Sequence, residues 1–187
     1  MRLLDPVGEV RVRLAAVGDI GVIGSARTRA RREGFDAAFT ALAPHARAAD
    51  LGFANLEFPV AEASEVRPGR SSEFHHDPET VAALARAGVG VVSLANNHVM
   101  DCGPPALERT RACCEAAGIQ AVGAGPDLET ARRPARLVVR GLSVVVLAYA
   151  EGAAHAAGTT APGSRRSTPR SCVRTSNAGA PRPMFSW

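Results

Sequence analysis

A predicted strand with almost only apolar residues, directly after a predicted helix, is the feature that most constrains how this chain can fold. Residues 89–95 (VGVVSLA) contain a single polar side chain and follow immediately on residues 77–88, DPETVAALARAG. The earlier stretch has helical boundaries, with Asp77 as N-cap, Pro78 at the first helical position and Gly88 as the stop. A strand that is apolar on both faces is typical of a parallel sheet covered on both sides, so we expect an α/β protein.

The same alternation of strand and helix recurs along the chain. Residues 104–118 are a predicted helix, and residues 35–50 have helical spacing but contain Pro44, which would bend or interrupt a helix. Residues 59–76 lack any period and are predicted to form a loop or lid. The predicted strands, of which the last two form a hairpin turning at Arg140-Gly141, are residues 10–18, 51–58, 89–95, 119–125 and 135–150. These elements predict a layered α/β sandwich.

The positive charge of the chain is confined to one end. The 187 residues include 22 basic side chains, all arginine, and 18 acidic ones, for a formal net charge of +4. Residues 1–151 carry 17 arginines and all 18 acids, a net charge of −1, whereas residues 152–187 carry five arginines and no acid. A basic face for nucleic acid is therefore not predicted on the folded part.

Residues 152–187 differ from the rest in composition as well as charge. They have no periodicity and almost no branched aliphatic side chains, so they are predicted to be a disordered tail. Their Arg, Pro, Ser, Ala and Gly content also matches a truncated or frameshifted reading of the gene. We expect one domain, residues 1–151, followed by this tail.

Cysteine usage and hydropathy indicate an intracellular protein. Cys102, Cys113, Cys114 and Cys172 show no CxxC spacing and are interpreted as small, partly buried thiols. The N-terminus lacks the apolar region of a signal peptide, and no apolar run reaches the length of about 18 residues that a membrane span needs. The expected location is cytoplasmic, without a transmembrane segment.

Polar side chains gather where three predicted strands end. Ligands of parallel α/β sheets bind beyond the carboxyl ends of the strands, so side chains at these ends are candidates for one site. Carboxylates, carboxamides and an imidazole together suit a divalent ion of the Mn, Fe or Zn type, which can activate water for hydrolysis. The candidates are Asp19 after the first strand, Asn55 and Glu57 on the second, and Asn96, Asn97, His98 and Asp101 after the third.

Several of these side chains have a purely structural alternative. Asn96 is interpreted as a turn residue that tolerates left-handed backbone. The residues that follow it could close a local hydrogen-bond network in which Asp101 accepts from His98. His75 and His76, next to a predicted helix start, are interpreted as solvated loop histidines.

The first strand end also has alternatives. Asp19 could cap or bind turn amides of residues 18–24, and Asn55 and Glu57 could simply share the face of an edge strand. Residues 18–24 (GDIGVIG) are glycine-rich enough to suggest a nucleotide-binding turn. Their spacing is GxxGxxG rather than GxGxxG, and no helix is predicted to begin there, so this hypothesis ranks last.

Several motifs in order resemble one protein family. The segments AVGDI, FANLEFPV, SLANNHVMDCG and VGAGPDLETARRPARL, within residues 10–150, resemble the poly-γ-glutamate capsule-synthesis protein (CapA, or PGA_cap) family, which is similar in fold to calcineurin-like metallophosphoesterases. The resemblance implies capsule or poly-γ-glutamate synthesis as the associated process and a small molecule or polymer as substrate. It implies metal binding by Asp19, Asn55, Glu57 and Asn97, a proton donor in His98, and an orienting role for Asp101.

The chain departs from the family pattern in its second half. The family's His-x-Gly and Gly-His-His-Pro-His segments are missing, and His155 is the one histidine beyond His98. The resemblance therefore implies that the chain is the N-terminal half of such a domain and is inactive alone. The apolar strand of residues 142–150 would then lack a neighbouring strand on one side. The alternative is a non-enzymatic binding module with a partial divalent-metal site.

Overall fold

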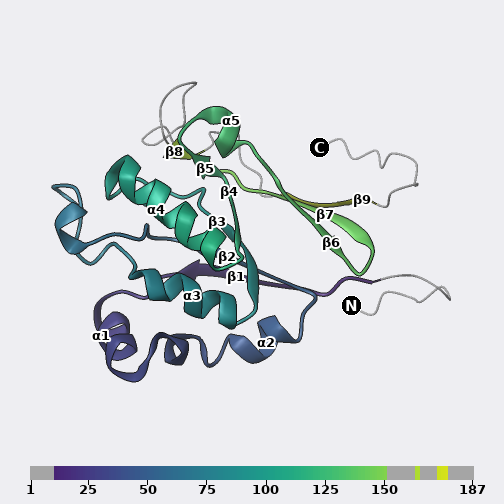
Figure 1. The fold of residues 1–187 in the computed structure, drawn as a ribbon, viewed down its shortest axis with the longest axis horizontal. Helices are drawn as coiled ribbons and strands as arrows, with labels where there is room; N and C mark the ends of the chain where they lie inside the picture. The colour runs from purple at the N-terminus through teal and green to yellow at the C-terminus, as the bar shows by residue number, and fades with distance from the viewer. Residues whose placement is uncertain (1–10, 151–162, 165–171, 177–187) are drawn as a thin grey trace.

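The fold consists of three layers, in which helices and an antiparallel sheet cover the two faces of a parallel sheet (Figure 1). The structure is a computed structural model that describes residues 11–150, 163–164 and 172–176. The parallel sheet has the order β1-β2-β3-β4, and its strands are Leu14–Ile20, Leu51–Leu56, Val89–Ser93 and Gln120–Val122. The predicted α/β architecture is confirmed.

Helices cover one face of this sheet. They are α1 (Gly24–Glu33), the 3-10 helix η1 (Phe35–Phe39), α2 (Ala43–Arg47), α3 (Pro78–Arg86) and α4 (Gly103–Ala116). The core on this side joins Val81 and Leu84 of α3 and Leu107 of α4 to Val92 of β3, all fully buried. Burial of branched aliphatic side chains of this kind contributes roughly 1.5–3 kcal/mol each.

The second sheet covers the opposite face. Strands β6 (Ala135–Val139) and β7 (Leu142–Leu147) form the predicted hairpin, and Val144 and Val146 of β7 pack against Val91 of β3. The hairpin turns at Arg140 and Gly141, whose φ angles of 50° and 80° are those of a two-residue type I′ turn. Because Val91 and Val92 enter different cores, β3 is buried on both faces as predicted.

Two short strands lie in the segment that was predicted to be disordered. Strand β9 (Cys172–Ser176) pairs antiparallel with β7, and β8 (Gly163–Ser164) pairs with β5 (Ala124–Gly125). The prediction of a disordered tail is therefore wrong for these two segments. Strand β9 also occupies the place beside β7 that was expected to be uncovered. The rest of residues 152–187 lies outside the described residues. The remaining short helices are η2 (Ala63–Glu65) and α5 (Leu128–Ala131).

Three local features show how the sequence sets the helices. Pro44 lies in the first turn of α2, so residues 35–50 form two short helices instead of one, as predicted. Gly88 ends the α3 region at φ 102°, where a Cβ would lie 2.9 Å from the backbone nitrogen of Arg47. Asp77 holds the predicted N-cap position, but its carboxylate binds the Arg31 guanidinium at 2.7 Å instead of a helix amide.

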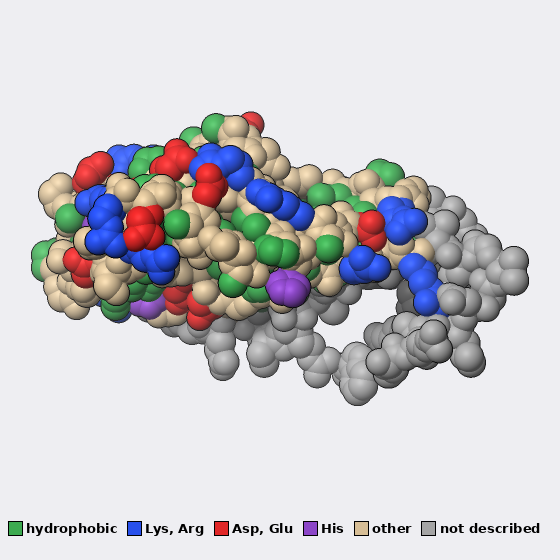
Figure 2. Space-filling model, turned by 90° about the horizontal axis from the view of Figure 1, so that it is seen from below, with side chains coloured by type: hydrophobic (Ala, Val, Ile, Leu, Met, Phe, Trp, Pro, Cys, Tyr) green, Lys and Arg blue, Asp and Glu red, His purple; other side chains and the backbone are tan. Residues whose placement is uncertain are grey.

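Charged side chains of both signs are mixed on the surface. Figure 2 views the side on which α1 and α2 lie, and shows arginine next to aspartate and glutamate, with hydrophobic side chains between them. Ion pairs such as Arg86 with Asp36 and Arg29 with Glu33 account for this mixture. No helix in the described part of the chain is long and apolar enough to cross a membrane.

Candidate metal and proton-transfer site

The register of the parallel sheet brings the predicted polar residues together. Asp19 in β1 lies directly opposite Asn55 in β2, and Asn55 lies opposite Ser93 in β3. The pairing of β1 with β2 shifts between Ala16 and Asp19, so a bulge aligns Asp19 with Asn55. Asp19 is thus inside β1 rather than after it, but the predicted meeting of strand ends is found.

The Asn55 amide links the two carboxylates of the site. Its Nδ2 donates to Asp19 Oδ1 at 2.8 Å and to Glu57 Oε2 at 2.5 Å. Burial, followed by the nearby Asp19 charge, raises the pKa of Glu57 above its ordinary value. The partly positive amide therefore occupies the space between two like charges, which is where a cation would be favoured.

Asn96 has a structural role that differs from the predicted one. Its backbone is not left-handed, since Arg140 is the one non-glycine residue with positive φ among the described residues. The buried Asn96 side chain donates from Nδ2 to the Leu56 carbonyl at 2.9 Å and to Asn55 Oδ1 at 3.2 Å. Its Oδ1 accepts from the His98 backbone N–H at 3.0 Å. Asn96 therefore ties the end of β2 to the loop that carries His98.

The neighbouring Asn97 is exposed to solvent, unlike Asn96. It lies between the buried amide of Asn96 and the half-buried ring of His98 in the same turn. The structure thus places the two adjacent asparagines differently, with one inside the hydrogen-bond network and the other on its outer side.

His98 and Asp101 form the second half of the cluster. His98 Nδ1 and Asp101 Oδ2 are 2.6 Å apart, and Asp101 is buried with its other oxygen 3.0 Å from Arg70 Nε. A carboxylate at this distance favours a proton on Nδ1 and fixes the orientation of the ring. The other ring nitrogen, Nε2, faces the carboxylate side of the site, 3.7 Å from Glu57 Oε1.

Two phenylalanines fix the His98 ring from its sides. The ring centroid lies 4.9 Å from that of Phe58 and 5.0 Å from that of Phe74, and the two phenylalanine rings stack at 5.0 Å. Phe58 follows β2, whereas Phe74 belongs to the segment predicted to be a loop or lid. This loop is therefore packed onto the site, with Phe74 on His98 and Arg70 on Asp101.

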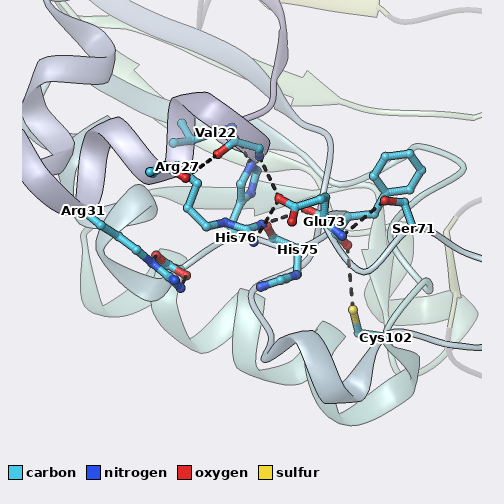
Figure 3. A network of polar contacts seen from close by, with 12 residues as sticks. Val22, Arg27, Arg31, Ser71, Glu73, His75, His76 and Cys102 are labelled. Carbon is cyan, nitrogen blue, oxygen red and sulfur yellow. Dashed lines mark hydrogen bonds and ion pairs between the residues drawn. The ribbon is translucent and has the colours of Figure 1, made fainter.

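A buried polar network anchors the loop to α1 (Figure 3). Arg27, which is 6% exposed, donates to the carbonyl oxygens of Glu73 and His75. The Glu73 carboxylate accepts from the first backbone amide of α1, that of Gly24, at 2.9 Å. These contacts bind both ends of Glu73 to the same helix, so they determine where the adjacent Phe74 lies.

The two loop histidines are buried, which corrects the prediction that they are solvated. His75 is 3% exposed and His76 fully buried, and His76 Nε2 accepts from the Val22 backbone N–H at 3.2 Å. Burial lowers the pKa of His76 to about 3 and also lowers that of His75. Both rings are therefore neutral components of the packing at neutral pH.

The glycine-rich turn after β1 does not provide an open phosphate site. Contrary to the prediction, a helix does begin there, at Gly24. Its first amide is bound by the Glu73 carboxylate, which takes the position that a phosphate would need. The nucleotide-binding hypothesis is not favoured by this arrangement.

The donor set fits a divalent ion in part. Two carboxylates and carboxamides meet at one edge of the sheet, and oxygen donors of this kind suit hard or borderline cations. Within residues 11–150, however, no three His, Cys, Asp or Glu side chains are grouped as a complete metal site.

The four-stranded parallel sheet with its covering helices defines an α/β protein, and the family that matches the chain has a metallophosphatase-like fold. The model of the family described as "Bacterial capsule synthesis protein PGA_cap" matches residues 13–181, and the chain belongs to this family. The predicted resemblance is confirmed.

Two kinds of curated relatives are similar to the chain. A probable polyglutamine synthesis accessory protein of Mycobacterium tuberculosis is 39% identical over 92 residues, which cover 49% of this chain and 24% of the relative. The capsule biosynthesis protein CapA of Bacillus anthracis is 28% identical over 144 residues, which cover 75% of this chain and 35% of the relative. The chain thus spans about a quarter to a third of the length of these relatives.

Proposed function

We propose that this CapA-like chain takes part in capsule or polyglutamate synthesis through a divalent-metal site at the carboxyl edge of its parallel sheet. The observation that carries the proposal is the continuous set of contacts from Asp19 through Asn55 and Glu57 to His98 and Asp101. The names of the curated relatives support the biological process, and the family's metallophosphatase-like fold supports the metal.

The proposed ligands are Asp19, Asn55, Glu57 and Asn97. An ion of the Mn, Fe or Zn type, when bound, would polarise a phosphoryl oxygen and lower the pKa of a bound water. Asp19 and Glu57 supply the negative charge, and both carboxylates accept hydrogen bonds from the Asn55 amide. Asn97 is exposed, so its amide can turn toward a ligand at low structural cost.

His98 is the proposed proton donor to a leaving oxygen. Asp101 accepts from Nδ1, so the proton to be transferred is carried on Nε2, the nitrogen that faces Glu57. Arg70 pairs with the second Asp101 oxygen at 3.0 Å and so helps to hold this buried carboxylate against His98. Phe58 and Phe74 prevent the ring from turning away and exclude water from its faces.

Residues 1–151 are proposed to be a partial domain, in keeping with the quarter to third of the curated relatives that the chain spans. In this proposal, hydrolysis would need further metal ligands, because the described residues contain no group of three His, Cys, Asp or Glu side chains. A non-enzymatic binding module is the second candidate, and the incomplete ligand group favours it. In that case, the site would bind the ion or an anion without turnover.

Calorimetric titration with Mn²⁺ tests the metal part of the proposal. Asp19→Asn should weaken binding at least tenfold, because it removes a charged ligand but keeps the hydrogen bond to Asn55. Asp36→Asn is the matched control, since Asp36 is an exposed aspartate that pairs with Arg86 instead. Equal affinities in the wild type and Asp19→Asn would contradict the site.

Turnover of a phosphoester with Mn²⁺ present separates the two candidate functions. His98→Gln should retain Mn²⁺ binding in both cases. If the wild type hydrolyses the ester and His98→Gln does not, the enzymatic proposal stands. Metal binding without hydrolysis in the wild type would exclude turnover by this chain alone, and would leave the binding module or a partial domain that lacks ligands for hydrolysis.

A further inference from the structure

An apolar pocket lies next to the candidate site, on the helix-covered side of β1. It occupies about 620 Å³ between the end of β1, helix α1 and the segment of η1 and residues 40–42. The volume is within the range of roughly 300–1,000 Å³ that is typical of sites for small organic molecules. We call it the alanine pocket, because Ala26, Ala30, Ala37, Ala38 and Ala41 line it.

Small side chains are the reason that this space is open. Val22, Ala30 and Phe39 form buried parts of the lining, whereas Ala26 and Ala38 are exposed at its edge. Each methyl group leaves room that a longer apolar side chain would fill. The pocket is therefore open to solvent, and its buried lining residues are apolar, which favours an apolar group that binds from outside.

The charges at the pocket also restrict what can bind there. Asp19 and Arg29 are the charged residues of the described lining, and the Arg29 guanidinium is already bound to Glu33 at 2.7 Å. An anionic group inside the pocket would have to give up its hydration without gaining an unpaired cation. Away from Asp19, the lining therefore favours an uncharged group.

Asp19 connects the alanine pocket to the polar cluster. The same residue lines the pocket and accepts the hydrogen bond from Asn55. A molecule with one apolar and one polar end could therefore contact both regions, with its polar end at Asp19.

We propose that the alanine pocket binds an uncharged aryl or alkyl group of the substrate, whose phosphoryl or similar anionic group lies at the Asp19 end. The substrate class is thus an anionic ester of an apolar alcohol. Placement of the anionic end rests on the proposed metal site, whereas binding of the apolar group does not.

Binding of 1-naphthol, followed by its fluorescence, tests the pocket separately from the metal site. Ala38→Phe and Ala26→Phe should each weaken binding at least tenfold, because the added ring fills the pocket from an exposed position. Ala112→Phe is the matched control on the exposed side of α4, beside another surface pocket, and should stay within twofold of the wild type. Circular dichroism and thermal unfolding confirm that each variant is folded.

The proposal is overturned if naphthol fails to bind at millimolar concentration, or if Ala112→Phe weakens binding as much as Ala38→Phe. Naphthol binding is measured without Mn²⁺, so a failed metal site and a failed pocket give different results. With Mn²⁺ present, 1-naphthyl phosphate should bind at least tenfold more tightly than 1-naphthol or inorganic phosphate. Equal affinities would overturn the assignment of pocket and metal site to one substrate.

Discussion

Replacement by alanine should reduce the stability of the protein at Asn96 but not at the adjacent Asn97. Asn96→Ala removes three hydrogen bonds and leaves the Leu56 carbonyl and the His98 N–H without these partners. Leaving a buried polar group unpaired costs about 1–3 kcal/mol. We therefore expect the free energy of unfolding to fall by about 3 kcal/mol, which lowers Tm by about 6–12 °C for a chain of this size.

Asn97→Ala is the matched control. Its side chain is exposed, so the free energy of unfolding should change by less than about 0.5 kcal/mol. The same variant should weaken Mn²⁺ binding, because it removes a proposed ligand. Urea unfolding monitored by circular dichroism, with Mn²⁺ titration of both variants, measures the two effects. Similar stability losses in Asn96→Ala and Asn97→Ala would refute the assigned roles.

Three further perturbations test other parts of the structure. The pKa of Glu57 is raised in the folded protein, so ionisation of Glu57 opposes folding. Glu57→Gln should therefore increase Tm more at pH 7 than at pH 4, and an equal increase at both pH values would contradict this. The pKa of His76 is lowered to about 3, so its contribution to stability is lost as pH falls from about 6.5 toward 3. His76→Gln should flatten the acid limb of a Tm–pH profile, and an unchanged limb would exclude His76 as its cause. Arg27→Met, which removes hydrogen bonds to the carbonyls of Glu73 and His75, should cost about 2–4 kcal/mol in urea unfolding, whereas the exposed Arg32→Met should cost less than about 0.5 kcal/mol.

The regular elements were predictable because their signals are local. Residues 89–95 are apolar on both faces, and the strand is covered on both sides. Pro44 and the Arg140-Gly141 turn act through their own backbone geometry, so their effects could be predicted without knowledge of the fold. The meeting of Asp19 with Asn55 followed from the general rule that parallel strands end at the same edge.

Helix α1 and the burial of the loop histidines depend on distant contacts. The inward side of α1 includes Arg27, a residue that local hydrophobic periodicity counts as solvent-exposed. Its burial is compensated by carbonyl groups more than 40 residues away, in the segment of Glu73 and His75. The buried ring of His76 likewise accepts a hydrogen bond from the backbone N–H of Val22, which lies in the turn after β1. Neither contact has a signal in the neighbouring sequence.

The roles of Asn96 and of the residues around His98 were missed for the same reason. The pair Asn96-Asn97 does not reveal which amide turns inward, since this depends on the position of Leu56 in the adjacent strand. Phe74 and Arg70 reach the site only because the loop is anchored to α1. An apolar residue beside two histidines, as in Phe74-His75-His76, was the one local indication of a buried loop.

The most direct test of the metal site is to locate Mn²⁺ by NMR. Substoichiometric Mn²⁺ added to the ¹⁵N-labelled chain broadens amide signals close to the ion. The proposed site predicts selective broadening at Asp19, Asn55, Glu57 and Asn97, and its loss in Asp19→Asn. Broadening centred elsewhere, or none at these four residues, would contradict the central claim that this edge of the sheet binds a divalent ion.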